Sequence, residues 1–327
     1  MNDVPVPENF ARKELENMKK MLQGACIVIG CTIFTLISGC QSSPVLQDNY
    51  YKNFSSTSPL EQRYSQRGHH YVSYAEYNSD NPSIKTVSVW YPQDIKSNDK
   101  RYPMIMVVNA SNTKASTYKP FFDRLASWGF IVVGTEVEQA GSGKTISVAL
   151  NFMLKNSALH DRIDTANIGI IGYSQGGAGA IRAVTEYSNS SIFKTIFTGS
   201  AAYATLAKNM GWEYNIAKVN IPYFMTAGTG SSDDRGVKDT ASEFGGVAPL
   251  SSLVNNYDGI SSNVKVRARV VGAEHGQMMT LTDGYMTAWM LYQLQSDKDA
   301  ASVFIGDKAE LLTNKKWQDV KKNVPSL

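Results

Sequence analysis

One serine lies in a sequence context typical of a nucleophile. Ser174 is the centre of residues 172–176, which read G-Y-S-Q-G, between the apolar run 168–171 and the small-residue stretch 177–181. This context predicts a strand, a sharp turn and a helix, with the serine Oγ exposed on the turn. Glycines two residues before and after the serine fit because the two backbones nearly touch there. The pattern indicates a serine nucleophile, and an ordinary glycine-rich turn is the alternative.

A serine hydroxyl needs a histidine base, and the imidazole needs a carboxylate that fixes its tautomer. His275 is the only histidine after Ser174, and it follows the alternating run 264–270 that predicts a strand. We therefore expect His275 to be the base. The other three histidines precede the serine and are interpreted as surface residues: His69, His70 and His160.

The acid is expected at the end of the strand between the serine and the histidine. Residues 221–227 predict that strand, and the turn after it carries Asp233 and Asp234. We expect Asp233, which is nearer to the strand, to be the acid, with Asp234 as the alternative. Glu274 would point away from the serine if His275 faces it.

Two backbone N–H groups would stabilise the negatively charged oxygen of an acyl intermediate. One belongs to the residue after the nucleophile, Gln175. The other comes from the loop after the third strand, here the loop after residues 103–108, and we assign it to Ser111. Together these residues predict acyl chemistry without a cofactor or a metal.

These residues need a scaffold in which strands alternate with helices. The sequence predicts an antiparallel pair at 70–77 and 84–91, further strands at 130–134 and 193–197, and helices at 117–128, 145–156 and 284–295. Such alternation implies a mostly parallel central sheet with helices on both faces. With the order serine, acid, histidine, this predicts an α/β-hydrolase fold over residues 68–327.

The net charge and the motifs exclude nucleic-acid binding and nucleotide binding. A net charge of +3 without a basic aromatic cluster excludes nucleic acid as a partner. Residues 141–145 resemble the end of a phosphate-binding loop, but Glu138 stands where that motif needs glycine. We expect a monomer that takes a small-molecule or lipid-like ester.

The N-terminus predicts export. Two lysines at 19–20 precede the uncharged run 22–39, so residues 1–39 are predicted to be a signal peptide, with a transmembrane helix as the alternative. The acidic residues before Met18 suggest that translation starts at Met18. Residues 40–67 are polar and predict a tether that begins at Cys40.

The chain resembles known families in two regions. The stretch Ile-Ser-Gly-Cys ending at Cys40 resembles the bacterial lipobox, which implies a lipidated cysteine and a protein anchored in the cell envelope, in the outer membrane facing the periplasm or the exterior. Residues 68–317 resemble α/β-hydrolases of the dienelactone hydrolase and polyester-hydrolase (cutinase-like) group, in segments 118–133 and 162–169 and at the serine turn.

The second resemblance implies that Ser174, Asp233 and His275 form a triad and that the protein is a serine esterase. Ser111 stands where the polyester hydrolases have an aromatic residue, and Gln175 where many have methionine. The alternatives are an acyltransferase with the same triad, and a binding lipoprotein that keeps the fold without turnover.

Overall fold

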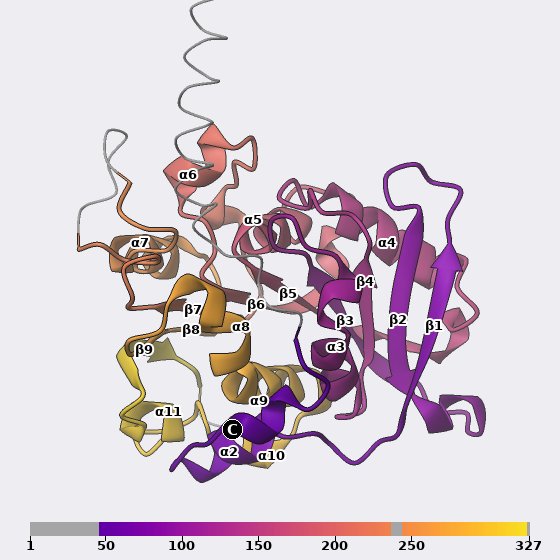
Figure 1. Cartoon of the computed structure of the whole chain (residues 1–327), viewed down its shortest axis with the longest axis horizontal. Helices are drawn as coiled ribbons and strands as arrows, with labels where there is room; N and C mark the ends of the chain where they lie inside the picture. The colour runs from indigo at the N-terminus through magenta and orange to yellow at the C-terminus, as the bar shows by residue number, and fades with distance from the viewer. Residues whose placement is uncertain (1–45, 237–243, 326–327) are drawn as a thin grey trace, which may run out of the picture. The chain divides into compact units, whose positions relative to one another are not determined.

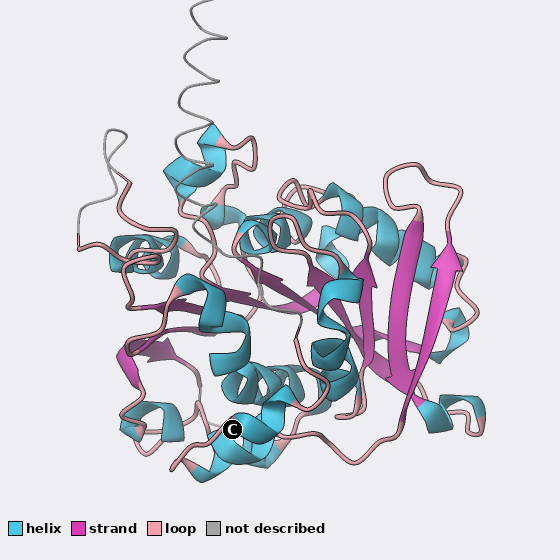
Figure 2. Cartoon of the chain, viewed as in Figure 1, coloured by secondary structure: helices cyan, strands magenta, loops and turns pink. Residues whose placement is uncertain are grey.

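A single sheet organises the computed structural model, which describes residues 46–236 and 244–325. Within these residues its order is β1-β2-β4-β3-β5-β6-β7-β8-β9, with the strands labelled in Figure 1 and drawn in magenta in Figure 2. The strands are β1 (Val72–Asn78), β2 (Thr86–Pro92), β3 (Tyr102–Val108), β4 (Ile131–Thr135), β5 (Ile163–Tyr173), β6 (Phe193–Gly199), β7 (Tyr223–Gly228), β8 (Lys265–Val270) and β9 (Trp317–Asn323).

The middle of the sheet is parallel and its edges are antiparallel. Strands β4, β3, β5, β6, β7 and β8 pair in parallel, whereas β1, β2 and β9 join by antiparallel pairing. Strand β3 is almost wholly apolar because helices cover both faces of the parallel part. Parallel strands end at the same edge, so the loops after β3, β5, β7 and β8 lie along one edge of the sheet.

Helices cover both faces of this sheet (Figure 1). Helices α4 (Lys144–Lys155), α5 (Gln175–Ala183) and α7 (Leu250–Gly259) pack on one face, and α3 (Lys119–Ala126) and α9 (Asp283–Gln295) on the other. The short helices are α2 (Pro59–Ser65), α6 (Ala204–Asn209), α8 (Met278–Leu281), α10 (Lys298–Ala301) and α11 (Glu310–Thr313). This is the predicted α/β-hydrolase fold, and the prediction of the fold class is confirmed.

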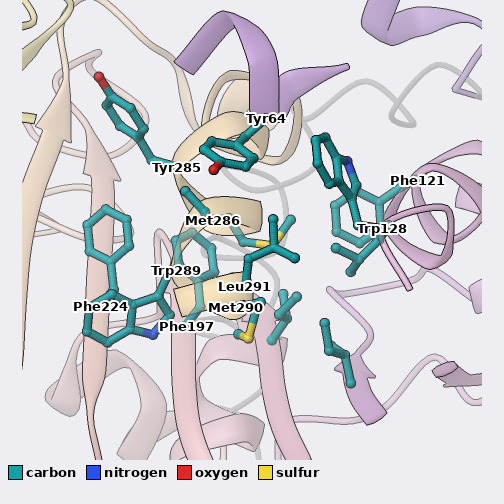
Figure 3. Close-up of a cluster of buried hydrophobic side chains, with 14 of the residues drawn as sticks. Tyr64, Phe121, Trp128, Phe197, Phe224, Tyr285, Met286, Trp289, Met290 and Leu291 are labelled. Atoms are coloured by element: carbon teal, nitrogen blue, oxygen red, sulfur yellow. The ribbon is translucent and has the colours of Figure 1, made fainter. Parts of the chain in front are cut away.

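Helix α9 contributes many residues to a cluster of buried hydrophobic side chains (Figure 3). It is apolar nearly all round because the sheet covers one side while α2 and α10 cover the other. Trp289 is fully buried against Phe224, and its indole N–H donates to Thr195 Oγ1 at 2.8 Å. The cluster therefore holds β6 and β7 firmly beneath the loops at their carboxyl ends.

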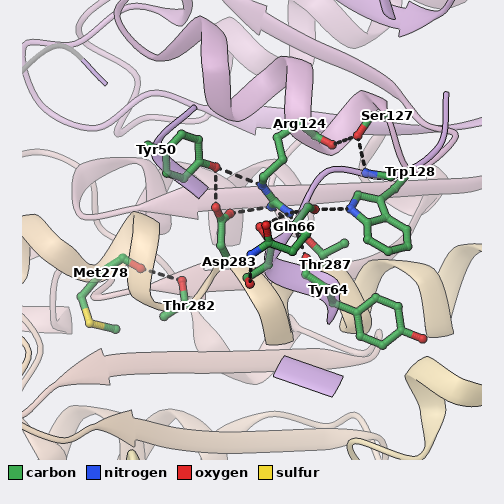
Figure 4. A network of polar contacts seen from close by, with 12 residues as sticks. Tyr50, Tyr64, Gln66, Arg124, Ser127, Trp128, Met278, Thr282, Asp283 and Thr287 are labelled. Carbon is green, nitrogen blue, oxygen red and sulfur yellow. Dashed lines mark hydrogen bonds and ion pairs between the residues drawn. The ribbon is translucent and has the colours of Figure 1, made fainter. Parts of the chain in front are cut away.

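Residues 50–66 belong to the packed domain, so the expectation of a tether over the whole of 40–67 is wrong. Tyr64 in α2 is fully buried, and Tyr51 is 8% exposed. The buried Arg124 guanidinium donates to Tyr64 O at 2.9 Å and to Tyr50 Oη at 3.0 Å (Figure 4). The polar composition concealed these aromatic anchors, whose partners lie far away in the sequence.

A buried ion pair completes this attachment. Arg124 Nη2 lies 2.6 Å from Asp283 Oδ1 on α9, and the Tyr50 hydroxyl donates to the same carboxylate (Figure 4). Burial raises the pKa of Asp283 to about 6, although Arg124 and Tyr50 favour its charged form. The network joins the N-terminal segment, α3 and α9 into one unit.

Two further observations bear on the expectations from sequence. The antiparallel edge strand β9 was not predicted, because its residues Trp317–Asn323 alternate only weakly. Among residues 46–236 and 244–325, no helix has the length and apolar character needed to cross a bilayer. The predicted signal peptide of residues 1–39, the start at Met18 and the lipidated Cys40 lie outside the described residues.

Candidate active site

Ser174 stands on a strained turn between β5 and α5. Its φ of +56° and ψ of −124° are rare for a residue with a side chain. A Cβ on Gly172 would lie 2.0 Å from Gly176 O, and one on Gly176 would lie 2.3 Å from Val108 O. The end of β5 therefore approaches the start of α5 at Gly172, and the start of α5 approaches the end of β3 at Gly176, so closely that only glycine fits at both positions. Ser174 itself remains partly exposed.

His275 and Asp233 lie together at the same edge of the sheet. His275 opens the short helix η7 (His275–Gln277) after β8, and its Nδ1 lies 2.6 Å from Asp233 Oδ1. Asp233 follows β7 and is fully buried. Its second oxygen accepts the Gly228 N–H at 2.7 Å and the hydroxyl of Ser200. The carboxylate is thus held so that one oxygen faces the imidazole, which is the arrangement that orients a histidine base in a serine triad.

Asp234, the alternative acid, has different partners. It forms an ion pair with Arg269, which also pairs with Asp319 Oδ2 at 2.7 Å. It also accepts the Leu250 N–H at 3.2 Å. Two adjacent carboxylates therefore point in different directions, one to the imidazole and one to a cation on β8.

Glu274 stabilises the loop that carries His275. Its exposed carboxylate accepts the hydroxyl and the N–H of Ser232, the latter at 2.9 Å, and the N–H of Ser231 at 3.2 Å. These hydrogen bonds lower the pKa of Glu274. The Ser232 hydroxyl oxygen in turn accepts the backbone N–H of His275 at 2.8 Å.

The expected oxyanion donors lie on neighbouring segments. Gln175 is the first residue of α5, so its N–H has no acceptor within the helix. Its buried side chain accepts the Ala140 N–H at 2.8 Å, so its amide oxygen is bound to the loop before α4. Ser111 lies in the turn after β3, and the preceding Asn109 side chain fixes that loop by donating to Thr135 O at 2.7 Å.

The remaining sequence features have other partners. His69 packs against Trp128, His70 Nδ1 lies 3.5 Å from Asp94 Oδ1, and His160 Nδ1 lies 2.9 Å from Ser157 O. The loop at residues 141–145 packs closely on α5, since a Cβ on Gly143 would lie 2.6 Å from Gly179 O. In the described part of the chain, no group of three or more histidine, cysteine or acidic side chains could hold a metal.

Sequence reasoning overlooked Ser200 and Arg269. Both are buried, and each contacts one of the two loop aspartates. Neither belongs to a recognisable motif, and the alternating run that contains Arg269 predicts a strand without predicting a partner for its side chain. Only the pairing of β6 with β7 and of β7 with β8 brings them to the acid loop.

The fold and the serine turn define an α/β-hydrolase. A protein family described as "PETase: PET hydrolase-like" matches residues 53–232, more than half of the 327 residues. The chain belongs to this family. The matched region begins before α2 and includes Ser174, but it ends one residue before Asp233.

Curated relatives match over shorter stretches. A bis(hydroxyethyl) terephthalate hydrolase of Streptomyces coelicolor is 28% identical over 101 residues, which is 29% of this chain and 32% of that protein. Cutinase est2 of Thermobifida alba is 27% identical over 106 residues, or 30% of this chain and 34% of the relative. Lipase 1 of a Moraxella species is 32% identical over 89 residues, which is 26% of this chain and 28% of that protein. The chain thus matches about a third of the length of these relatives.

Proposed function

We propose that this protein is a serine esterase that hydrolyses carboxylic esters through an acyl-enzyme. The observation that carries the proposal is the contact of His275 Nδ1 with the buried Asp233, at the sheet edge where the strained turn exposes Ser174. The membership of the PET hydrolase-like family supports it, as do relatives named as a cutinase, a lipase and a bis(hydroxyethyl) terephthalate hydrolase.

The mechanism assigns one role to each residue. Ser174 Oγ attacks the ester carbonyl while His275 Nε2 removes its proton, and Asp233 holds the tautomer that leaves Nε2 free to accept. The N–H groups of Gln175 and Ser111 stabilise the oxyanion. His275 then returns the proton to the leaving alcohol, and water releases the acid by the same steps in reverse.

The proposal extends to the cellular place of the reaction. The lipobox-like sequence before Cys40 supports a lipid-anchored protein of the bacterial envelope that meets small or lipid-like esters there. A diacyl group together with an N-acyl chain would exceed the two signals that stable anchoring needs.

Covalent labelling tests the chemistry. Wild-type protein should react with a fluorophosphonate probe and hydrolyse p-nitrophenyl esters, whereas Ser174→Ala should do neither while keeping its circular dichroism spectrum. Ser302→Ala is the matched control and should behave as wild type. Ser302 lies in an exposed turn, where its hydroxyl donates to Asp299 O. Unlabelled, inactive wild type would favour the binding lipoprotein instead.

A panel of substrates extends this experiment. p-Nitrophenyl esters of rising acyl length, with bis(hydroxyethyl) terephthalate as an aromatic diester, would define the acyl group. Partitioning of the acyl group between water and an added alcohol separates hydrolysis from acyl transfer, which uses the same acyl-enzyme.

A further inference from the structure

The segment after β6 links the candidate nucleophile to the candidate acid. Gly199 O accepts the Ser174 N–H at 3.0 Å, and the Ala202 N–H donates to Ser174 O at 3.3 Å. Between these two contacts, the Ser200 hydroxyl donates to Asp233 Oδ2. Residues 199–202 therefore touch both ends of the site and fix the spacing between them.

Ser200 is held in an unusual backbone conformation. Its φ is +47°, which costs free energy for any residue with a Cβ, and such strain persists only where the surroundings impose it. The side chain is 1% exposed, and the N–H donates to Thr226 O at 2.8 Å on the neighbouring strand β7. Serine at this position directs its hydroxyl onto the acid, which glycine or alanine could not do.

The surroundings of Asp233 make that hydroxyl important. The carboxylate is fully buried, and its Oδ2 accepts from only Gly228 N and Ser200 Oγ in the described part of the chain. A buried carboxylate that loses a donor has no water to replace it. With both donors on Oδ2, the carboxylate plane is fixed and Oδ1 faces His275 Nδ1.

We propose that Ser200 is a positioning residue, which orients Asp233 and through it the imidazole of His275. The proposal rests on the esterase mechanism above, because it takes Asp233 and His275 as the acid and the base. Ser200 acts through the carboxylate and makes no contact with substrate.

The other charged groups near the pair are already engaged. Glu274 accepts hydrogen bonds from Ser231 and Ser232, and Asp234 pairs with Arg269. Neither arrangement involves the Ser200 hydroxyl, so removing that hydroxyl leaves the partners of Glu274 and Asp234 in place.

Two variants separate the hydroxyl from the backbone. Ser200→Ala removes the hydroxyl and keeps the cost of a positive φ, whereas Ser200→Gly removes both. The matched control is Thr226→Val, which deletes a buried hydroxyl that bonds Thr198 O at 3.1 Å on the neighbouring strand. Thermal melts monitored by circular dichroism establish that each variant is folded.

The kinetic result expected is the same for both Ser200 variants. We expect kcat for a p-nitrophenyl ester to fall about 10- to 100-fold, the effect of one hydrogen bond to a charged group, with little change in KM. The acidic limb of the pH profile should move to higher pH, because a carboxylate with one donor fewer attracts the imidazolium more strongly. Thr226→Val should keep the wild-type kcat, and the acidic limb of its pH profile should stay where it is in wild type. Ser200 variants with kcat within twofold of wild type and an unmoved limb would overturn the proposal.

A spectroscopic measurement tests the positioning role apart from the esterase function. The Nδ1 proton between His275 and Asp233 should give a far-downfield proton resonance that disappears in His275→Ala. This resonance should shift in both Ser200 variants and stay in place in Thr226→Val. If wild type is inactive but the shift occurs, the esterase proposal fails and the positioning role stands. An unshifted resonance, or none in wild type, refutes the positioning role.

Discussion

Replacing Asp233 by asparagine should disable the base without disturbing the fold. Two donors, the Gly228 N–H and the Ser200 hydroxyl, converge on Asp233 Oδ2. An asparagine side chain must therefore place its single oxygen there, since its NH₂ group would face two donors. The NH₂ group then replaces Oδ1, 2.6 Å from His275 Nδ1 in wild type, and Nδ1 must become an acceptor.

The consequence for the reaction follows from the tautomer. If Nδ1 accepts, the imidazole proton lies on Nε2, the atom that should take the proton from Ser174. A triad with the wrong tautomer loses about 10⁴-fold in kcat, as in a well-studied serine protease of another fold. We expect a loss of that size for Asp233→Asn in the hydrolysis of p-nitrophenyl butyrate at about pH 8.

Asp234→Asn is the matched control, one residue away. It weakens the contact with Arg269, which keeps its partner Asp319 at 2.7 Å. We expect kcat within a few-fold of wild type and a free energy of unfolding lower by about 1–2 kcal/mol. If Asp233→Asn keeps more than a tenth of the wild-type kcat, the tautomer argument is refuted. A 10⁴-fold loss in folded Asp234→Asn would instead make Asp234 the acid.

Four further changes test other parts of the molecule. Gly176→Ala should displace the serine turn and lower kcat about 100-fold, measured with p-nitrophenyl esters. Arg124→Met should leave the buried Asp283 carboxylate without its cationic partner and lower the free energy of unfolding in urea by about 3–5 kcal/mol. The pKa of Glu274 is lowered in the folded protein, so its carboxylate stabilises the loop at every pH above the ordinary pKa of 4.5. This stabilisation is lost as the pH falls through the lower pKa of the folded state. Amide protection in that loop should thus fall on acidification in wild type but not in Glu274→Gln. Cys40→Ser should move the protein from the membrane fraction to the soluble fraction, or leave the signal uncleaved.

Each of these expectations has a result that would contradict it. Wild-type kcat in Gly176→Ala would mean that the turn tolerates a Cβ. An unchanged urea midpoint in Arg124→Met would show that the ion pair adds no stability. Equal loop protection at pH 3 and pH 7 in wild type would remove the role of Glu274. Membrane retention of Cys40→Ser with a cleaved signal would exclude the lipid anchor.

The sequence alone determined the class of fold and the place of the serine. Gly172 and Gly176 flank Ser174 because two backbones approach there, and such a local requirement is visible as a spacing of residue types. The alternation of apolar strands and helices is equally local, so the parallel sheet could be predicted. His275 followed from counting, since no other histidine comes after the serine.

Only the tertiary structure decided which aspartate meets the imidazole. Asp233 and Asp234 are neighbours of the same type, and the backbone of one turn directs them to His275 and to Arg269. Ser200 became visible for the same reason, since its contact with Asp233 crosses from the end of β6 to the loop after β7.

The N-terminal segment and the edge strand show the same limit of prediction from sequence. Residues 50–66 have the composition of a linker, yet Tyr50 meets Asp283 across 233 positions of sequence. Strand β9 forms because β8 offers it an antiparallel partner, although its own alternation is weak. Local spacing encodes strands, turns and caps, whereas a partner far along the chain exists only once the backbone has folded and buried both groups.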